Sequence, residues 1–243
     1  LSGAELDAYR TAESQAIVNG YLGLAAALAV VAAVVWMFRN KLKGEKHEAS
    51  AGLAGLDLLK RPRFGYGALC IFLYVGAEVS IGSLIVSYLM QDHVMGSQEQ
   101  AAGKLIGLYW GGAMVGRFIG SAVMRLVSPG KLLACVAAGA ITLILISIST
   151  TGAVSGYSLL AIGLMHAIMF PTIFTLGIKG LGPLTEEGSG LLIMAIAGGA
   201  LVVVQGWLAD AYGLQTSFLL TAACELYVLF YALWGSKTTA DPA

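Results

Sequence analysis

Residues 64–90 read FGYGALCIFLYVGAEVSIGSLIVSYLM, an apolar run whose one charged side chain is Glu78. A helix needs roughly 20 apolar residues to cross the hydrocarbon core of a bilayer, and this run is longer than that. Its apolar residues follow one another without alternation, which excludes a strand of a membrane barrel. We therefore predict a transmembrane helix with a carboxylate near its middle.

The rest of the chain has the same character. Of its 243 residues, 58% are apolar. Charged residues make up 12%, against roughly 25% in an average soluble domain. This composition excludes a soluble enzyme, a secreted disulfide scaffold and a disordered chain. The 14 basic and 14 acidic residues balance, so nothing indicates nucleic-acid binding, and the three cysteines have no metal-ligand spacing.

Six further apolar runs are long enough, or nearly so, to cross a bilayer. They cover residues 17–38, 103–127, 131–150, 157–178, 189–211 and 217–235. Only helices and closed barrels satisfy the backbone hydrogen-bonding groups in lipid, and these runs do not alternate. We predict an all-α integral membrane protein with seven transmembrane helices.

The basic residues predict the orientation, because cytoplasmic segments are rich in lysine and arginine. With residues 39–63 on the cytoplasmic side, most of the 14 basic residues fall inside. Arg10 and Lys104 fall outside, and Arg117 lies within a span. We expect the N-terminus of this chain outside the membrane and the C-terminus in the cytoplasm.

Residues 39–63 are the longest connection between the predicted spans. They form either a short helix on the inner membrane surface or a solvated basic linker. They separate the lone span of residues 1–38 from six spans in residues 64–235, and residues 236–243 are a cytoplasmic tail. The six spans make two triplets that begin on opposite sides of the membrane. This predicts an inverted repeat of three and three helices, as in many secondary transporters.

Ionisable residues inside the predicted spans indicate a functional or structural role, because placing a charged side chain in a bilayer costs free energy. Glu78 and His166 lie near the middle of the leading helices of the two triplets, so we expect both to face one central cavity. Each also has a structural alternative, since a protonated acid or a neutral histidine can satisfy itself by hydrogen bonding. We expect Glu225 to be structural, packed against a neighbouring helix.

The third span contains two rows of glycines at four-residue spacing, and such rows let helices approach closely. The rows are Gly103, Gly107 and Gly111, and Gly112, Gly116 and Gly120. We expect Gly116, Gly120 and Arg117 to form a structural or gating region near the cytoplasm. Pro171 lies five residues after His166 and should kink or loosen the fifth helix, because it lacks a backbone N–H.

Several aromatic and amide side chains in the spans have the chemistry of a sugar site. A sugar ring presents an apolar C–H face to an aromatic ring and hydroxyls to carboxylate, imidazole or amide groups. Trp110, Tyr109, Tyr74 and Gln205 fit this description. The alternative is that the aromatic residues anchor the helices at the interface or fill the packing.

Five segments together have the pattern of one family of membrane proteins. They are FLYVGAEVSIGS at 72–83, YWGGAMVGRFIG at 109–120, FPTIF at 170–174, TEEGSG at 185–190 and QGWLAD at 205–210. In this order they resemble the seventh helix, the eighth helix, the tenth helix with its following loop, and the end of the eleventh helix. The family is the major facilitator superfamily, in its fucose, glucose and galactose permease branch. The EVSIG motif looks closer to the glucose/galactose members.

The resemblance implies that the seven spans are helices six to twelve of a twelve-helix transporter. Residues 39–63 would then be the linker between its halves, and residues 64–235 the C-terminal six-helix bundle. One departure lies in the cytoplasmic loop pattern, where Met124 stands in place of an acidic residue before Arg125. The latch made by that acid is therefore not expected here.

For function, the resemblance implies transport of a hexose, glucose or galactose, across a bacterial inner membrane by alternating access. The coupling cation would be H⁺ or Na⁺, with no other cofactor and no metal. The partners would be the sugar, the bilayer and the first half of the same transporter, which carries the family's known proton-handling carboxylates. The residues expected to bind sugar or cation are Glu78, Tyr74, Trp110, His166 and Gln205.

Three other readings of the sequence stay open. The chain can be a permease for fucose or another hexose, or a seven-span receptor or sensor. A membrane-embedded enzyme is disfavoured, because the sequence has no catalytic motif such as HExxH or GxSxG. On the transporter reading we expect the chain to be a fragment that does not transport by itself, because alternating access needs two halves.

Overall fold

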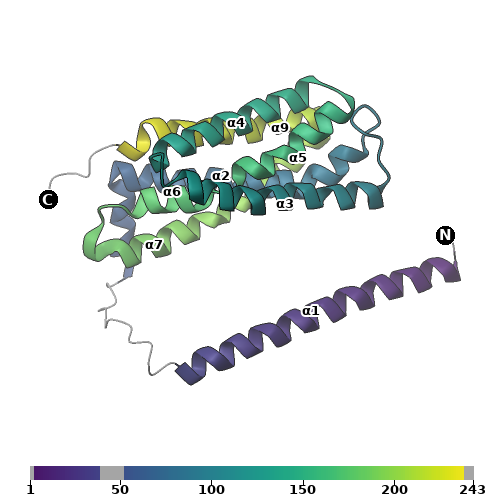
Figure 1. Cartoon of the computed structure of the whole chain (residues 1–243), viewed down its shortest axis with the longest axis horizontal. Helices are drawn as coiled ribbons and strands as arrows, with labels where there is room; N and C mark the ends of the chain where they lie inside the picture. The colour runs from purple at the N-terminus through teal and green to yellow at the C-terminus, as the bar shows by residue number, and fades with distance from the viewer. Residues whose placement is uncertain (1–2, 39–51, 238–243) are drawn as a thin grey trace. The chain divides into compact units, whose positions relative to one another are not determined.

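The computed structural model describes residues 3–38 and 52–237, and its regular structure there is entirely helical (Figure 1). The chain divides into two compact units, residues 1–49 and residues 50–243. Within the described part, six helical segments are long and apolar enough to cross a membrane. The prediction of an all-α, multi-pass membrane protein is confirmed.

The first unit contains helix α1, Ala4–Phe38. Its segment Asp7–Phe38 is one of the six candidate spans. Every side chain described in this helix is exposed, so α1 buries no side chain within its own unit.

The second unit is a bundle whose spans begin a few residues earlier than the apolar runs predict. Helices α2 and α4 each start with a proline, which suits the first turn because its missing N–H would have no helical partner. The elements are η1 (Gly52–Lys60), α2 (Pro62–Met90), α3 (Glu99–Val123), α4 (Pro129–Ser149), α5 (Gly152–His166), α6 (Met169–Ile178), η2 (Gly182–Leu184), α7 (Thr185–Met194), η3 (Ala195–Ala200), α8 (Leu201–Tyr212), α9 (Leu214–Leu233) and η4 (Gly235–Lys237).

Helix α3 is the least apolar of the long helices. Its 25 residues are enough to cross a bilayer, since a helix rises about 1.5 Å per residue. Its sequence is nevertheless less apolar than the six segments described above, and it is not one of them. The glycine rows, Lys104 and Arg117 lower its hydropathy.

Two spans are broken near their middle. The segment Gly152–Ile178 divides into α5 and α6 at a turn over residues 167–168. Pro171 explains the place of the break, because a proline cannot donate to the carbonyl four residues earlier, which here is Ala167. The segment Gly182–Tyr212 passes through the 3-10 helix η3, which contains the neighbouring glycines Gly198 and Gly199.

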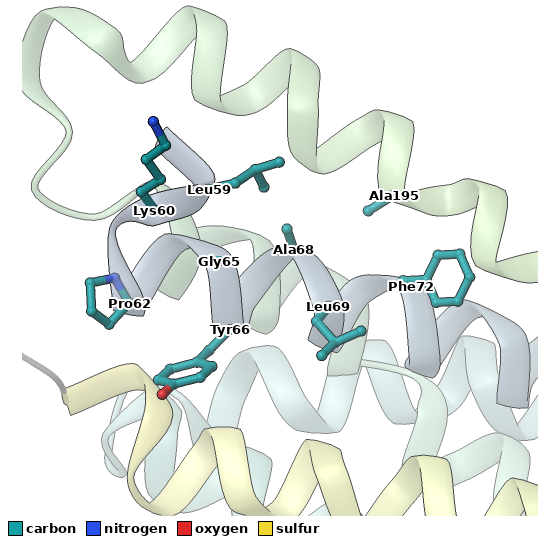
Figure 2. A pocket seen from close by; sticks show the side chains of 9 residues that line it. All are labelled: Leu59, Lys60, Pro62, Gly65, Tyr66, Ala68, Leu69, Phe72 and Ala195. Carbon is teal, nitrogen blue, oxygen red and sulfur yellow. The ribbon is translucent and has the colours of Figure 1, made fainter. Parts of the chain in front are cut away.

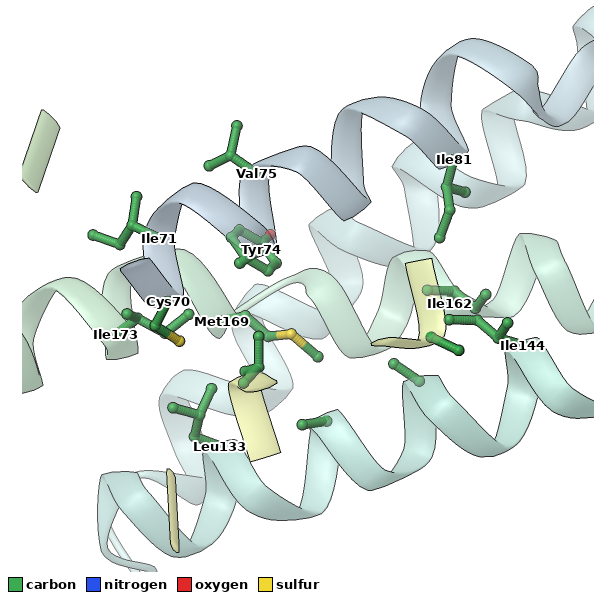
Figure 3. Packing of buried hydrophobic residues seen from close by; sticks show 14 of the residues in the cluster. Cys70, Ile71, Tyr74, Val75, Ile81, Leu133, Ile144, Ile162, Met169 and Ile173 are labelled. Carbon is green, nitrogen blue, oxygen red and sulfur yellow. The ribbon is translucent and has the colours of Figure 1, made fainter. Parts of the chain in front are cut away.

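Helix α2 lies at the centre of the bundle and packs against α9, η3, α6, α3 and α8. Figure 3 shows Ile71, Tyr74 and Ile81 of α2 packing with residues of α4, α5 and α6. All three are essentially inaccessible. Lipid tails are as apolar as these side chains, so close van der Waals packing holds the helices together more than removal from water does.

Much of the predicted linker lies outside the described residues, namely 39–51, as do residues 238–243 of the predicted tail. The described remainder contains the short helix η1, which packs against α2 and α7. Leu58 is its buried residue, at 4% exposure, whereas Leu56 and Leu59 are exposed. Asp57 and Lys60 form an exposed ion pair at 2.7 Å, whose hydrogen bond lowers the pKa of Asp57 and raises the pKa of Lys60.

Consecutive spans of the bundle run in opposite directions, so most of its basic residues gather at one end. The start of α2, the turn between α3 and α4, and the ends of α6 and α9 all lie there (Figure 1). Arg63 also ties two of these helices together, since its Nε donates to the carbonyl of Leu176 at 3.2 Å. The other end is joined by hydrogen bonds of Tyr88, Ser147 and Gln215, which the sequence did not predict.

Candidate functional site

A buried polar cluster around His166 lies inside the bundle. The hydroxyl of Tyr109 lies 2.9 Å from Nδ1 of His166, and Oε1 of Glu225 lies 2.9 Å from Nε2. The imidazole and the carboxylate are at most 2% exposed, and Tyr109 is fully buried. Three helices, α3, α5 and α9, therefore contribute one continuous chain of polar side chains.

The break in the fifth span helps to position His166. It is the last residue of α5, directly before the turn that precedes Pro171. The hydroxyl of Tyr74 donates to the main-chain carbonyl of His166 at 3.1 Å, and the two rings meet edge to face at 5.5 Å. Tyr74 thus connects the central helix α2 to the end of α5.

A second polar pair lies one helical turn along α9 from Glu225. Oγ1 of Thr221 donates to Oε1 of Gln205 at 2.8 Å, and both residues are buried. Two atoms here have no protein hydrogen-bond partner, Nε2 of Gln205 and Oε2 of Glu225. Buried polar groups are normally hydrogen-bonded, so these atoms keep capacity for a further polar contact.

Glu78 lies at the margin of this cluster and is half-buried. Its carboxylate is near enough to the hydroxyls of Tyr74 and Tyr109 to interact electrostatically with both. Within the described residues it forms no ion pair. Arg117, which lies within the third predicted span, does not pair with Glu78 in this structure.

Trp110 lies against α2 at Gly82, one helical turn after Glu78. A Cβ atom added to Gly82 would be 3.4 Å from the indole. The indole also meets the ring of Tyr109 edge to face, with centroids 5.0 Å apart, and Trp110 stays 49% exposed. An accessible aromatic side chain therefore lies one helical turn along α2 from a half-buried acidic residue.

The glycine-rich region of α3 is a packing surface. A Cβ at Gly116 would lie 2.6 Å from the Cβ of Ala167 and 2.7 Å from the carbonyl of Leu164, and one at Gly120 would meet Ile168. Gly116 and Gly120 thus let α3 approach the break between α5 and α6, which supports the structural expectation for them. Pro171 itself is exposed.

Arg117 does not take part in this packing. Its side chain is exposed, and it makes neither an ion pair nor a side-chain hydrogen bond within the part of the chain that the structure describes. Within the described residues, the structure therefore shows no polar contact of Arg117 that would support its predicted structural or gating role.

Only one of the two glycine rows is packed. A Cβ at Gly103, Gly107 or Gly111 would meet nothing within 4 Å. The row with Gly112, Gly116 and Gly120 faces α5 and the start of α6. Spacing alone did not distinguish the rows.

The structure adds two residues to the predicted set. Tyr109 was a candidate for the cavity but had no assigned partner, and Glu225 was expected to be structural. Their meeting with His166 was not visible from the sequence, because Glu225 follows His166 by 59 positions. The available signal was that both are ionisable residues inside apolar runs.

A separate surface groove of about 560 Å³ lies between the start of α2 and the middle of the sixth span. Figure 2 shows Leu69 and Phe72 of α2 and Ala195 of η3 among its lining, with Lys60 at one edge. Its walls are mainly apolar, and none of the predicted site residues lines it. It therefore differs from the polar cluster in both place and chemistry.

Chemically, the cluster combines proton-carrying groups with a ligand surface. Carboxylates, imidazole and phenols can hold or pass protons, whereas an indole beside a carboxylate can bind a ring with an apolar face and hydroxyl groups. No group of three or more metal-ligating residues occurs within residues 3–38 and 52–237.

Comparison with known proteins gives a consistent set of relatives. The chain is 45% identical over 236 residues to the glucose/galactose transporter of Brucella abortus biovar 1 (strain 9-941), which covers 97% of this chain and 57% of that protein. It is 39% identical over 234 residues to a putative glucose/galactose transporter of Helicobacter pylori (strain J99), covering 94% of this chain and 56% of that protein. It is 31% identical to the L-fucose-proton symporter of Escherichia coli (strain K12), covering 99% of this chain and 56% of that protein.

A solved structure has the same fold. It is the crystal structure of a major facilitator superfamily transporter, FucP, in the outward conformation, with a TM-score of 0.80 and 29% identity. The match covers 98% of this chain and 59% of that one. No family model matches the chain. The chain thus spans somewhat more than half the length of the relatives it matches.

Proposed function

Because the chain belongs to the major facilitator superfamily, in its fucose, glucose and galactose permease branch, we propose that it forms the C-terminal half of a hexose transporter. The six spans from α2 to α9 would be that half, and α1 the last helix of the other. The transporter would work by alternating access, with the two halves moving about a site near the middle of the membrane. The relatives are transporters, so neither an enzyme nor a receptor is proposed.

One observation carries the sugar assignment, namely the accessible indole of Trp110 against Gly82 of α2, one helical turn from the half-buried Glu78. The indole offers a face for the C–H side of a sugar ring, and the carboxylate can accept hydrogen bonds from its hydroxyls. Tyr109 meets the indole edge to face, and Tyr74 and Tyr109 both hydrogen-bond to His166. Gln205 is held by Thr221, and its free amide nitrogen can donate to a ligand or a water molecule.

Glucose or galactose is the proposed substrate in preference to fucose. The relatives with the higher identities, 45% and 39%, carry the name glucose/galactose transporter, whereas the fucose symporter is at 31%. We propose coupling to a cation, H⁺ or Na⁺, with Glu78 as the residue in this half nearest to the sugar surface. The name of the fucose relative includes a proton, which favours H⁺.

The proposed location is the inner membrane of a bacterium, with the basic end of the bundle in the cytoplasm. The positive-inside rule supports this orientation, because the basic residues gather at one end. A second half is supported by the length of the relatives and by the glycine row of α3 that faces no neighbour.

The indole gives the first test. In the proposed transporter, Trp110→Ala should raise the KM for hexose counterflow about tenfold, which corresponds to about 1.4 kcal/mol of lost ring contact. Trp234→Ala is the matched control, since this exposed Trp caps the far end of α9, and it should leave KM unchanged. Equal KM values for wild type and Trp110→Ala would remove Trp110 from the sugar site.

A further inference from the structure

We propose that His166 and Glu225 form a binding site for one exchangeable proton, and that Tyr109 links this site to Glu78. The inference rests on the proposed cation-coupled transport and specifies where the coupling proton resides in this half. The sequence predicts His166 as a binding residue but Glu225 only as a structural one. The pairing of the two is therefore new to the candidate site.

The two side chains of the pair are buried and within hydrogen-bonding distance of each other. Nε2 of His166 and Oε1 of Glu225 are 2.9 Å apart, and the two side chains are 1% and 0% exposed. This is the distance of a charge-assisted hydrogen bond. The pair lies where the fifth span breaks, so its imidazole sits at the junction of two helical segments.

The charge of the pair depends on the groups around it. The titratable groups that interact with Glu225 are Cys70 and Tyr74 from α2, Tyr109 from α3 and Cys224 from α9, and Glu78 interacts in turn with the two tyrosines. None of them is a cation, and within the described residues neither lysine nor arginine forms an ion pair with Glu225. An ionised Glu225 beside a neutral His166 would leave a net negative charge buried, which is costly inside a membrane. One added proton makes the pair neutral overall.

Oε2 of Glu225 has no protein hydrogen-bond partner, so this buried oxygen can take up a proton without the loss of a protein hydrogen bond. On the other side, the hydroxyl of Tyr109 is hydrogen-bonded to Nδ1 of His166 and is near enough to the carboxylate of Glu78 to interact with it electrostatically. A hydroxyl both donates and accepts, so it can pass a proton from one neighbour to the other.

One proton moves from Glu78 to His166 through the hydroxyl of Tyr109. Protonated Glu78 gives its proton to the oxygen of Tyr109, while the hydroxyl proton of Tyr109 moves to Nδ1 of His166. Tyr109 ends unchanged, Glu78 becomes a carboxylate, and His166 becomes an imidazolium whose Nε2–H is bonded to Glu225. Release follows the reverse order. Glu78 is half-buried and therefore the end of this chain nearest to an accessible surface.

The first test reads the protonation state directly. The chain has three histidines, His47, His93 and His166, so the nitrogen NMR spectrum of isotopically labelled histidine is simple enough to assign in a lipid bilayer. His166 should carry protons on both nitrogens near neutral pH in the wild type and on one nitrogen in Glu225→Gln. His93→Gln serves for assignment and should change neither. A wild-type His166 with a single proton throughout the range from about pH 5 to pH 8 contradicts the proposal.

The second test reads coupling in the transporter. Glu225→Gln should keep hexose counterflow but lose accumulation driven by a pH gradient, and Tyr109→Phe should slow accumulation while His166 keeps its NMR signature. Wild-type accumulation in Glu225→Gln overturns this inference while hexose transport stands. If the wild type shows no hexose counterflow at all, the proposed function fails, and the NMR result still decides whether the pair holds a proton. Should Glu225→Gln not fold, the wild-type NMR titration and Tyr109→Phe decide.

Discussion

Replacing Glu78 by Gln in the proposed transporter should abolish uphill accumulation of hexose while exchange of hexose across the membrane continues. The amide keeps the size of the side chain and its ability to accept a hydrogen bond, but it cannot take up and release a proton. Exchange needs only a sugar site and alternating access, whereas accumulation needs the coupled cation. Accumulation should therefore fall to the equilibrium level.

The measurement compares counterflow and gradient-driven uptake of labelled glucose in the same vesicles. Asp210→Asn is the matched control, because this carboxylate is exposed near the end of α8, away from the cluster. A loss of both activities in Glu78→Gln would assign Glu78 to sugar binding instead. Wild-type accumulation from about pH 5 to pH 8 would exclude both roles.

Replacing Gly163 by Leu should prevent stable packing of the bundle. A Cβ at this position would fall on the main-chain carbonyl of Tyr109, so the two backbones at the crossing of α3 and α5 are in direct contact. Backbone cannot move aside as a side chain can, and forcing the helices apart would also stretch the bond between Tyr109 and His166. Overpacking of this kind costs about 3 kcal/mol or more.

Thermal unfolding of the purified chain in detergent measures the effect of Gly163→Leu. Gly107→Leu is the control, because a Cβ there meets nothing within 4 Å, and its transition should stay near that of the wild type. An unchanged transition for Gly163→Leu would show that α3 and α5 do not cross as described. A lowered transition for Gly107→Leu would show instead that its glycine row is packed in the purified chain.

The spans were predictable because membrane helices impose long apolar runs, which local sequence displays. The break near Pro171 was also predictable, since a proline acts on its own helix. The turn falls at residues 167–168 because the lost hydrogen bond belongs to the carbonyl of Ala167, four residues before the proline. Local chemistry was sufficient in both cases.

Contacts between distant helices were not predictable in the same way. His166 and Glu225 stood out as separate ionisable residues, but their pairing depends on how α5 and α9 rotate about their own axes. The two glycine rows of α3 share one spacing, and only the neighbours decide that Gly116 is packed while Gly107 is not. Arg117 was expected in that packed region, but its side chain is exposed.

We propose that this chain is one half of a hexose transporter. Uptake of labelled glucose into vesicles tests it most directly, with this chain reconstituted either alone or within the full transporter we propose. When both halves are present, we predict saturable glucose uptake that galactose inhibits. This chain alone should show no saturable uptake, because alternating access needs two halves. Saturable uptake by this chain alone, or none by the folded two-half protein, would contradict it.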